Sequence, residues 1–207
     1  MIQTLVIAAI AGAVGSLLVA IRGGDRSLEL LSKTAASVGF VCFGMLRWSA
    51  GDPTDSWLVV GLALCAVGDL FLLGRRRFVV GIAAFLAGHL AYIVAFSLAA
   101  PWASWSMPVL ATVGCTSTAA LVWLWPRLGR LRIPVAAYIA AISIMVWGAL
   151  SASLSGSLAW TVGVGGLLFY LSDLAVARHR FVKEEFLNRG VGLPIYYAGQ
   201  VLIALGI

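Results

Sequence analysis

One apolar stretch, Trp57 to Leu73 (WLVVGLALCAVGDLFLL), constrains the fold more than any other part of the sequence. It is apolar enough to cross a bilayer, yet it contains an ionisable side chain, Asp69, directly after Gly68. A charged side chain at mid-membrane costs about 2.5 to 3.5 kcal/mol on insertion scales, so Asp69 should face protein or water and have a compensating partner. The best candidates lie in a second apolar run, at Ser172-Asp173-Leu174. The sequence therefore suggests that two intramembrane aspartates, one from each half of the chain, form one site.

The composition supports the same class of protein. Hydrophobic residues make up 62% of the 207 residues and charged residues only 11%, and the mean hydropathy is +1.03. These values are typical of a polytopic membrane protein and not of a soluble domain. Membrane-spanning segments of about twenty residues each leave little room for another domain, so we expect residues 1–207 to form a single transmembrane domain.

Apolar runs of spanning length predict the fold class, which is all-α with eight transmembrane helices. Arginine-rich and proline-containing segments separate the runs. The predicted spans are Ile2 to Ile21, Leu28 to Trp48, Trp57 to Leu73, Phe78 to Leu98, Trp105 to Trp125, Ile133 to Leu150, Leu158 to Ala177, and Val191 to Ile207.

The basic residues predict the orientation. They gather in the odd-numbered loops, whereas the even-numbered loops hold only Arg47, at a helix end. The positive-inside rule then places the odd loops in the cytoplasm and both termini on the outer side. The basic residues that give the net charge of +6 lie in the loops, where they determine the topology, so we expect no nucleic-acid partner. We expect a multi-pass protein of the bacterial inner (plasma) membrane.

The two halves of the sequence also resemble each other. Gly68-Asp69-Leu70, a basic cluster and Phe78 are echoed by Ser172-Asp173-Leu174, a basic cluster and Phe181. The echo suggests two four-helix repeats, which would place both aspartates on helices that run the same way. Small residues at Gly12-xxx-Ser16 and Ala84-xxx-Gly88 predict close helix contacts.

Helix rise predicts that polar residues of five runs meet at one depth. At 1.5 Å per residue, Asp69 lies about 9 Å inside Arg75, and Asp173 lies about 7 to 8 Å inside Arg178. The same estimate places Lys33 and Tyr196 about 10 Å, and His89 about 18 Å, from their nearest cytoplasmic charges. Tyr92 lies three residues after His89, and Gln200 lies four residues after Tyr196 and three after Tyr197, so these helices each present a polar face. We therefore expect a polar cavity that opens towards the cytoplasmic leaflet.

Each of these residues also has a structural interpretation. Either aspartate could serve only as an ion-pair partner of Lys33 or an arginine, Lys33 could extend to the interface, and His89 could be a hydrogen-bonded core residue. Two carboxylates at one depth favour a function, because the pair can hold one proton and so place a general acid beside a general base. We find no cluster of histidines and cysteines suited to a metal, and we expect no cofactor.

Four motifs in order carry a resemblance to a known family: Gly68-Asp69, Gly88-His89-Leu90-Ala91-Tyr92, Ser172-Asp173 and Tyr196-Tyr197-Ala198-Gly199-Gln200. They are similar to motifs of the YhhN-like lysoplasmalogenases, which are eight-helix membrane proteins. The resemblance implies hydrolysis of the vinyl ether bond of a lysoplasmalogen to a fatty aldehyde and a glycerophospho-alcohol. It implies Asp69 and Asp173 as the catalytic carboxylates, and residues around the lysophospholipid substrate that include Lys33, His89, Tyr92, Tyr196, Tyr197 and Gln200.

This chemistry needs a proton for the alkene carbon and stabilisation of an oxocarbenium-like cation, as in glycoside hydrolysis. The sequence does not tell which aspartate is the acid. The main alternative is a proton-coupled small-molecule or lipid transporter, in which the aspartates bind ions and Gly163, Gly165 and Gly166 mark a broken helix. A structural protein with a buried ion pair is a third possibility. The surrounding membrane lipids are the other expected partners, and the oligomeric state stays open.

Overall fold

The structure is a computed structural model that describes residues 1–73 and 77–207. Arg75 and Arg76, which belong to a predicted break between spans, lie outside the described residues. The described part is all helical, as predicted, with three short 3-10 segments at Trp102–Ser104, Trp125–Arg127 and Gly129–Leu131. Its long helices are α1 (Ile2–Gly23), α2 (Arg26–Arg47), α3 (Pro53–Leu72), α4 (Phe78–Ala99), α5 (Met107–Leu124), α6 (Arg132–Leu154), α7 (Trp160–Phe181) and α8 (Phe186–Leu205).

Several helices begin before the apolar run that predicted them, because polar residues cap and form their first turns. Asp25 accepts hydrogen bonds from the amides of Ser27 and Leu28, so α2 begins at Arg26. Asp52 accepts one from the amide of Thr54, and Pro53 occupies the first turn of α3, a position that proline favours. The helix α8 begins at Phe186, before the predicted Val191, because a first turn that contains Asn188 and Arg189 precedes the apolar run.

Seven of these helices, α1 to α7, are long and apolar enough to cross a membrane. The helix α8 is not among them, since its first turn carries Asn188 and Arg189 and its C-terminal half carries Gln200. The chain is accordingly a multi-pass helical membrane protein.

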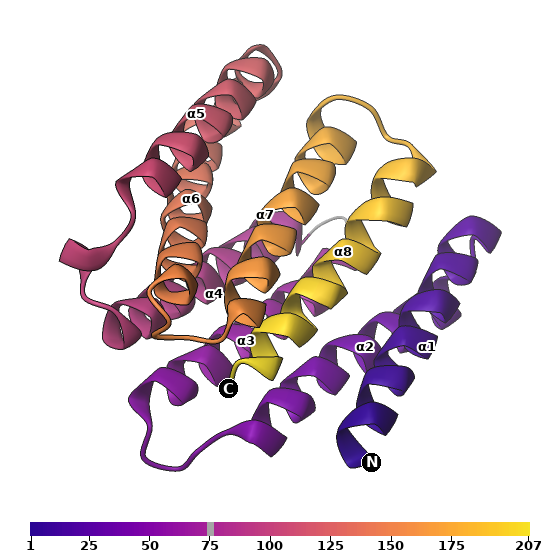
Figure 1. Ribbon diagram of the computed structural model, residues 1–207. Coiled ribbons are helices and arrows are strands. Elements are labelled where there is room, and N and C mark those ends of the chain that lie inside the picture. Colours follow the sequence, from indigo (N-terminus) through magenta and orange to yellow (C-terminus); the bar gives the residue numbers. More distant parts are fainter. Residues whose placement is uncertain (74–76) are drawn as a thin grey trace.

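The helices lie side by side in one bundle (Figure 1). The helices α1 and α2 stand at one edge and the α5–α6 hairpin at the other, while α3, α4, α7 and α8 fill the centre. The two termini lie at the same end of the bundle, and the α7–α8 connection lies at the opposite end. The tightest pairs are α3 with α4 and α7 with α8, and α2 and α6 pack respectively on α8 and α4.

Glycines bring the helices of each central pair together in the same way. Gly61 on α3 and Gly165 on α7 each lie eight residues before the aspartate of their helix. A Cβ added at Gly88 of α4 would lie 3.3 Å from the carbonyl oxygen of Gly61, and one added at Gly199 of α8 would lie 2.8 Å from the carbonyl oxygen of Gly165. The two pairs therefore use matching contacts.

The predicted small-residue contacts are confirmed in part. Gly88 packs against Cys65 and the carbonyl of Gly61, as expected for a close helix pair. Ser16 lies at the interface between α1 and α2, where its hydroxyl oxygen accepts a hydrogen bond from the hydroxyl of Ser32 over 2.9 Å. The prediction is wrong for Gly12, which has no neighbouring atom within 4 Å of an added Cβ. A small residue at the right spacing does not by itself show which face of a helix is packed.

We expect Gly165→Ala to destabilise the bundle by about 1–3 kcal/mol, since the new methyl group would overlap backbone atoms that cannot rotate away. The added Cβ would lie 2.7 Å from the carbonyl oxygen of Gly199 and 2.9 Å from the amide nitrogen of Ile203. Thermal unfolding in detergent measures the effect. Gly114→Ala on α5 is the matched control, because nothing lies within 4 Å of its Cβ position. Equal melting temperatures for the two variants would contradict the close contact.

Candidate functional site

Asp69 lies on α3, almost fully buried, and is surrounded by donors from α2 and α8. The ammonium of Lys33 is 3.1 Å from its Oδ1 atom, and the exposed fractions of the two side chains are 8% and 3%. The hydroxyls of Ser37 and Tyr196 donate to Oδ2, each over 2.8 Å. Lys33 is thus the compensating partner that the sequence requires. The three donors suit a carboxylate better than a carboxylic acid, because an acid would use one acceptor position for its own proton.

A short chain of hydroxyls extends from Asp69. Ser37 donates its only proton to Asp69, so the hydroxyl of Tyr197, 3.1 Å away, is the donor to Ser37. Tyr197 also lies 3.4 Å from the carbonyl of Lys33. We refer to Lys33, Ser37, Asp69, Tyr196 and Tyr197 as the Asp69 cluster. Tyr197 acts on the carboxylate indirectly, through the hydroxyl of Ser37 and through the ring of Tyr196, whose centroid lies 4.9 Å from its own.

Asp173 lies on α7 and is held by side chains from α4 and α6. The hydroxyl of Tyr138 donates to its Oδ2 atom over 2.7 Å, and the Nε2 atom of His89 lies 3.5 Å from the same oxygen. Nε2 also lies 3.0 Å from the Tyr138 hydroxyl. Because that hydroxyl gives its proton to Asp173, Nε2 carries the proton in this contact. The Asp173 cluster is His89, Tyr138 and Asp173; its carboxylate is 17% exposed and has no lysine or arginine in contact within the described part of the chain.

Both carboxylates line one cavity of about 690 Å³. Lys33, Tyr138, Tyr170 and Tyr196 also face it, and apolar residues of α3, α4, α6 and α7 complete its wall. Arg26 lines the cavity as well and has an exposed side chain, so the cavity reaches the surface at the start of α2. The structure therefore brings Asp69, Asp173, Lys33 and Tyr196 together at one cavity, as the depth estimate predicts.

The other predicted site residues lie behind this cavity. His89 is fully buried, and the hydroxyl of Tyr92 donates to Oε1 of Gln200 over 2.7 Å, which links α4 to α8. His89, Tyr92, Tyr197 and Gln200 do not line the cavity. The ring of Phe169 on α7 packs on both clusters, with its centroid 4.7 Å from that of His89 and 5.4 Å from that of Tyr196. These contacts indicate that the residues behind the cavity, Phe169 included, fix the positions of the side chains that line it.

Two residues of the site were missed by the sequence analysis, although a signal for each exists. Ser37 lies four residues after Lys33, on the same face of α2. Tyr138 lies about 9 Å from Arg132 by helix rise, the same depth as Asp69. A search for hydroxyls at that depth would have found Tyr138, and a search along the face of α2 that carries Lys33 would have found Ser37.

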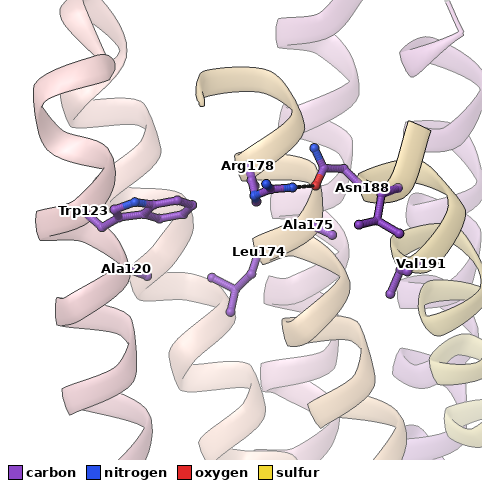
Figure 2. Close-up of a pocket in the computed structure, with 8 residues that line it drawn as sticks. Ala120, Trp123, Leu174, Ala175, Arg178, Asn188 and Val191 are labelled. Atoms are coloured by element: carbon purple, nitrogen blue, oxygen red, sulfur yellow. Dashed lines mark hydrogen bonds between the residues drawn. The ribbon is translucent and has the colours of Figure 1, made fainter. Parts of the chain in front are cut away.

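A groove adjoins the cavity on the side of α5 (Figure 2). It has a volume of about 420 Å³ and shares Ala120, Leu174, Ala175 and Asn188 with the cavity wall. Figure 2 shows Trp123 of α5 across from Leu174 of α7. Its apolar lining suits a hydrocarbon chain.

A polar contact closes one end of this groove. The guanidinium of Arg178 donates to Asn188 and to Glu185, and Lys183 also pairs with Glu185. The hydrogen bond from Lys183, followed by the charges of Lys183 and Arg178, lowers the pKa of Glu185 from its ordinary value. At neutral pH the ionised form of Glu185 therefore holds the connection between α7 and α8 in place.

Among residues 1–73 and 77–207, no three His, Cys, Asp or Glu side chains lie close enough together to hold a metal ion. The charged groups at the cavity are instead two carboxylates in unlike surroundings. One is paired with an ammonium and two hydroxyls, and the other is held by a tyrosine and a histidine. In such an arrangement one carboxyl group can serve as an acid and the other as an anion, with one bound molecule between them.

The helices and this cavity define a class: a multi-pass helical membrane protein with two buried carboxylates on a cavity that reaches one end of the bundle. The chain belongs to the YhhN family, whose model matches residues 28–207.

Three curated relatives are similar over most of this chain. A lysoplasmalogenase of Mycobacterium bovis is 40% identical over 161 residues, which cover 72% of this chain and 59% of that protein. The lysoplasmalogenase TMEM86A of Bos taurus is 31% identical, covering 74% and 65%, and the lysoplasmalogenase TMEM86B of Sus scrofa is 35% identical, covering 76% and 66%. The chain thus spans about six tenths of the length of the first of these relatives. No solved structure matches the chain.

Proposed function

We propose that this protein is a membrane hydrolase of the lysoplasmalogenase type, which cleaves the vinyl ether bond of a lysoplasmalogen to a fatty aldehyde and a glycerophospho-alcohol. The observation that carries the proposal is the pair of carboxylates in unlike surroundings on one cavity. The names of the curated relatives support the substrate class.

The surroundings of the two carboxylates favour one assignment of roles. Asp173 is the proton donor, because it faces the cavity without a lysine or arginine in contact among the described residues and is held by Tyr138 and His89. Asp69 is the anion, because Lys33, Ser37 and Tyr196 all donate to it. An ammonium and two hydroxyls fix its charge in place before substrate binds, so little reorganisation is needed as the cation forms.

The reaction consumes one water. The electron pair of the C=C bond takes the proton of Asp173, which forms a C–H bond and leaves an oxocarbenium cation stabilised by the carboxylate of Asp69. Water then adds to the carbon next to oxygen while Asp69 takes its proton, giving a hemiacetal. Asp173 removes the hemiacetal hydroxyl proton, the bond to the glycerol oxygen breaks, and Asp69 returns its proton to that oxygen. Both carboxyl groups end in the state in which they began.

The predicted substrate-binding residues divide into two groups by position. Tyr196 and Lys33 line the cavity and can touch substrate, as can Tyr138. His89, Tyr92, Tyr197 and Gln200 act from behind, through their contacts with the lining groups and with each other. The hydrocarbon chain of the lysophospholipid occupies the apolar wall and the adjoining groove, next to the surrounding membrane lipids.

The packing of the helices supports a topology of eight spans. We propose that α8 also spans, because it packs against α7, α2, α1 and α3 and so shields its polar residues from lipid. Eight spans place the termini at one end, and the positive-inside rule makes this the outer side of a bacterial inner membrane. Matching glycine contacts in α3–α4 and α7–α8 support two four-helix repeats.

A transporter is not favoured. The relatives are named as enzymes, and α7 runs unbroken through Gly163, Gly165 and Gly166, whereas discontinuous helices are typical of transporter sites.

The direct test is aldehyde release from a lysoplasmalogen by the purified protein in detergent. We expect turnover with the vinyl ether and none with the saturated ether analogue, which has no alkene carbon to protonate. A monodisperse sample that releases no aldehyde, but carries a pH-driven flux in liposomes, would refute the hydrolase and favour transport.

A further inference from the structure

A cluster of charges at the open end of the cavity has no part in the proposed reaction. Glu29, in the first turn of α2, is paired with Arg26 of the same turn, 3.3 Å away, and with Arg189 in the first turn of α8. The side chain of Glu29 is 9% exposed, whereas those of Arg26 and Arg189 are 67% and 33% exposed. One buried carboxylate thus holds two arginines that keep part of their surface in solvent.

All three residues line the cavity, together with Arg180 from the last turn of α7. The guanidinium of Arg180 lies 4.5 Å from the centre of the Phe78 ring, which also lines the cavity. We call Arg26, Arg180 and Arg189 the arginine rim. Glu29 and Glu184 also line the cavity, so together with the arginine rim they carry a net charge of about +1, and this end of the cavity still attracts an anion.

The lysine inside the cavity is not free for such an anion. The ammonium of Lys33 is buried and paired with Asp69, and an anion bound to it would compete with that carboxylate. A guanidinium that gives one edge to a carboxylate still has further N–H donors in its plane. The arginine rim therefore supplies donors that Lys33 does not.

We infer that the arginine rim binds the phosphate of a lysophospholipid head group and so orients the lipid with its ether bond towards the two aspartates. This inference rests on the proposed function, since it concerns the substrate of the same cavity. Arginine binds phosphate through paired N–H donors, and Glu29 holds two of the arginines in place. The phosphate lies at the surface end, and the hydrocarbon chain lies at the apolar wall.

The inference is tested by binding, without need of turnover. The probes are two saturated ether lipids that cannot be cleaved, an alkyl lysophosphatidylcholine and the matching alkyl glycerol without phosphate. We expect Arg189→Gln and Arg180→Gln each to weaken binding of the phospholipid about tenfold or more, the effect of a lost charge-assisted hydrogen bond. Binding of the alkyl glycerol should not change.

Three comparisons make the result decisive. Arg127→Gln, at an arginine that does not itself line the cavity, should leave both affinities unchanged. Arg189→Lys should recover only part of the loss, because an ammonium keeps the charge but not the planar pair of donors. Arg180→Gln leaves the Glu29 pairs intact, so it remains informative if Arg189→Gln unfolds.

Equal affinity of the wild type for the two probes, or equal weakening of both by the rim variants, would overturn the inference. The proposed function fails separately, by absence of aldehyde release from a lysoplasmalogen that binds normally.

Discussion

Asp173→Asn is expected to lower the rate of aldehyde release by about a hundredfold to ten-thousandfold, the usual contribution of a general acid. Asparagine keeps the size of the side chain and can still accept the hydrogen bond from Tyr138, but it has no acidic proton for the alkene carbon. The measurement is kcat for a lysoplasmalogen, with the melting temperature of the same sample in detergent.

Asp55→Asn is the control for this variant. Asp55 is also a buried aspartate, but it accepts from the amide of Ser49 at the far end of α3, so its replacement should leave kcat unchanged. An Asp173→Asn protein that keeps near-normal turnover would rule out the assignment of Asp173 as the acid.

Lys33→Met is expected to cost about 3–5 kcal/mol of stability, because it leaves the carboxylate of Asp69 buried without its cation. The two groups are 3.1 Å apart and both are buried, so solvent replaces little of the lost interaction. Thermal or denaturant unfolding in detergent measures the change.

The double variant Lys33→Met/Asp69→Asn separates the contribution of the ion pair to stability from that of the surrounding packing. It should be more stable than either single variant, since neither charge remains to be compensated. The same reasoning makes Asp69→Asn alone an ambiguous test of catalysis, because it leaves an unpaired lysine. Additive losses in the double variant would mean that Lys33 and Asp69 do not stabilise each other.

The sequence predicts which polar residues meet at one cavity better than it predicts their partners. Helix rise from the flanking arginines is enough to place Asp69, Asp173, Lys33 and Tyr196 at one level. Which helices lie next to one another is decided by packing between segments far apart in the chain. The contact of Tyr196 with Asp69 and the contact of Tyr138 with Asp173 therefore appear only in the structure.

The direction that each helix face takes explains why some predicted site residues do not line the cavity. Tyr92 and Gln200 are as polar as the lining residues but lie further along their helices, and their hydrogen bond to each other lies behind the cavity. The sequence shows that such residues need a partner, and it does not show whether the partner is a substrate or another side chain. The Gly12 contact fails for a related reason, since spacing indicates a possible interface without locating it.

The Asp69 cluster and the Asp173 cluster each combine side chains from both halves of the chain. Asp69 belongs to the first half and is held by Tyr196 of α8, whereas Asp173 belongs to the second half and lies against His89 of α4. Neither half contains all the side chains that hold its own aspartate. A change that loosens the packing of one half thus disturbs the carboxylate of the other, so substitutions in the two halves are not independent of each other.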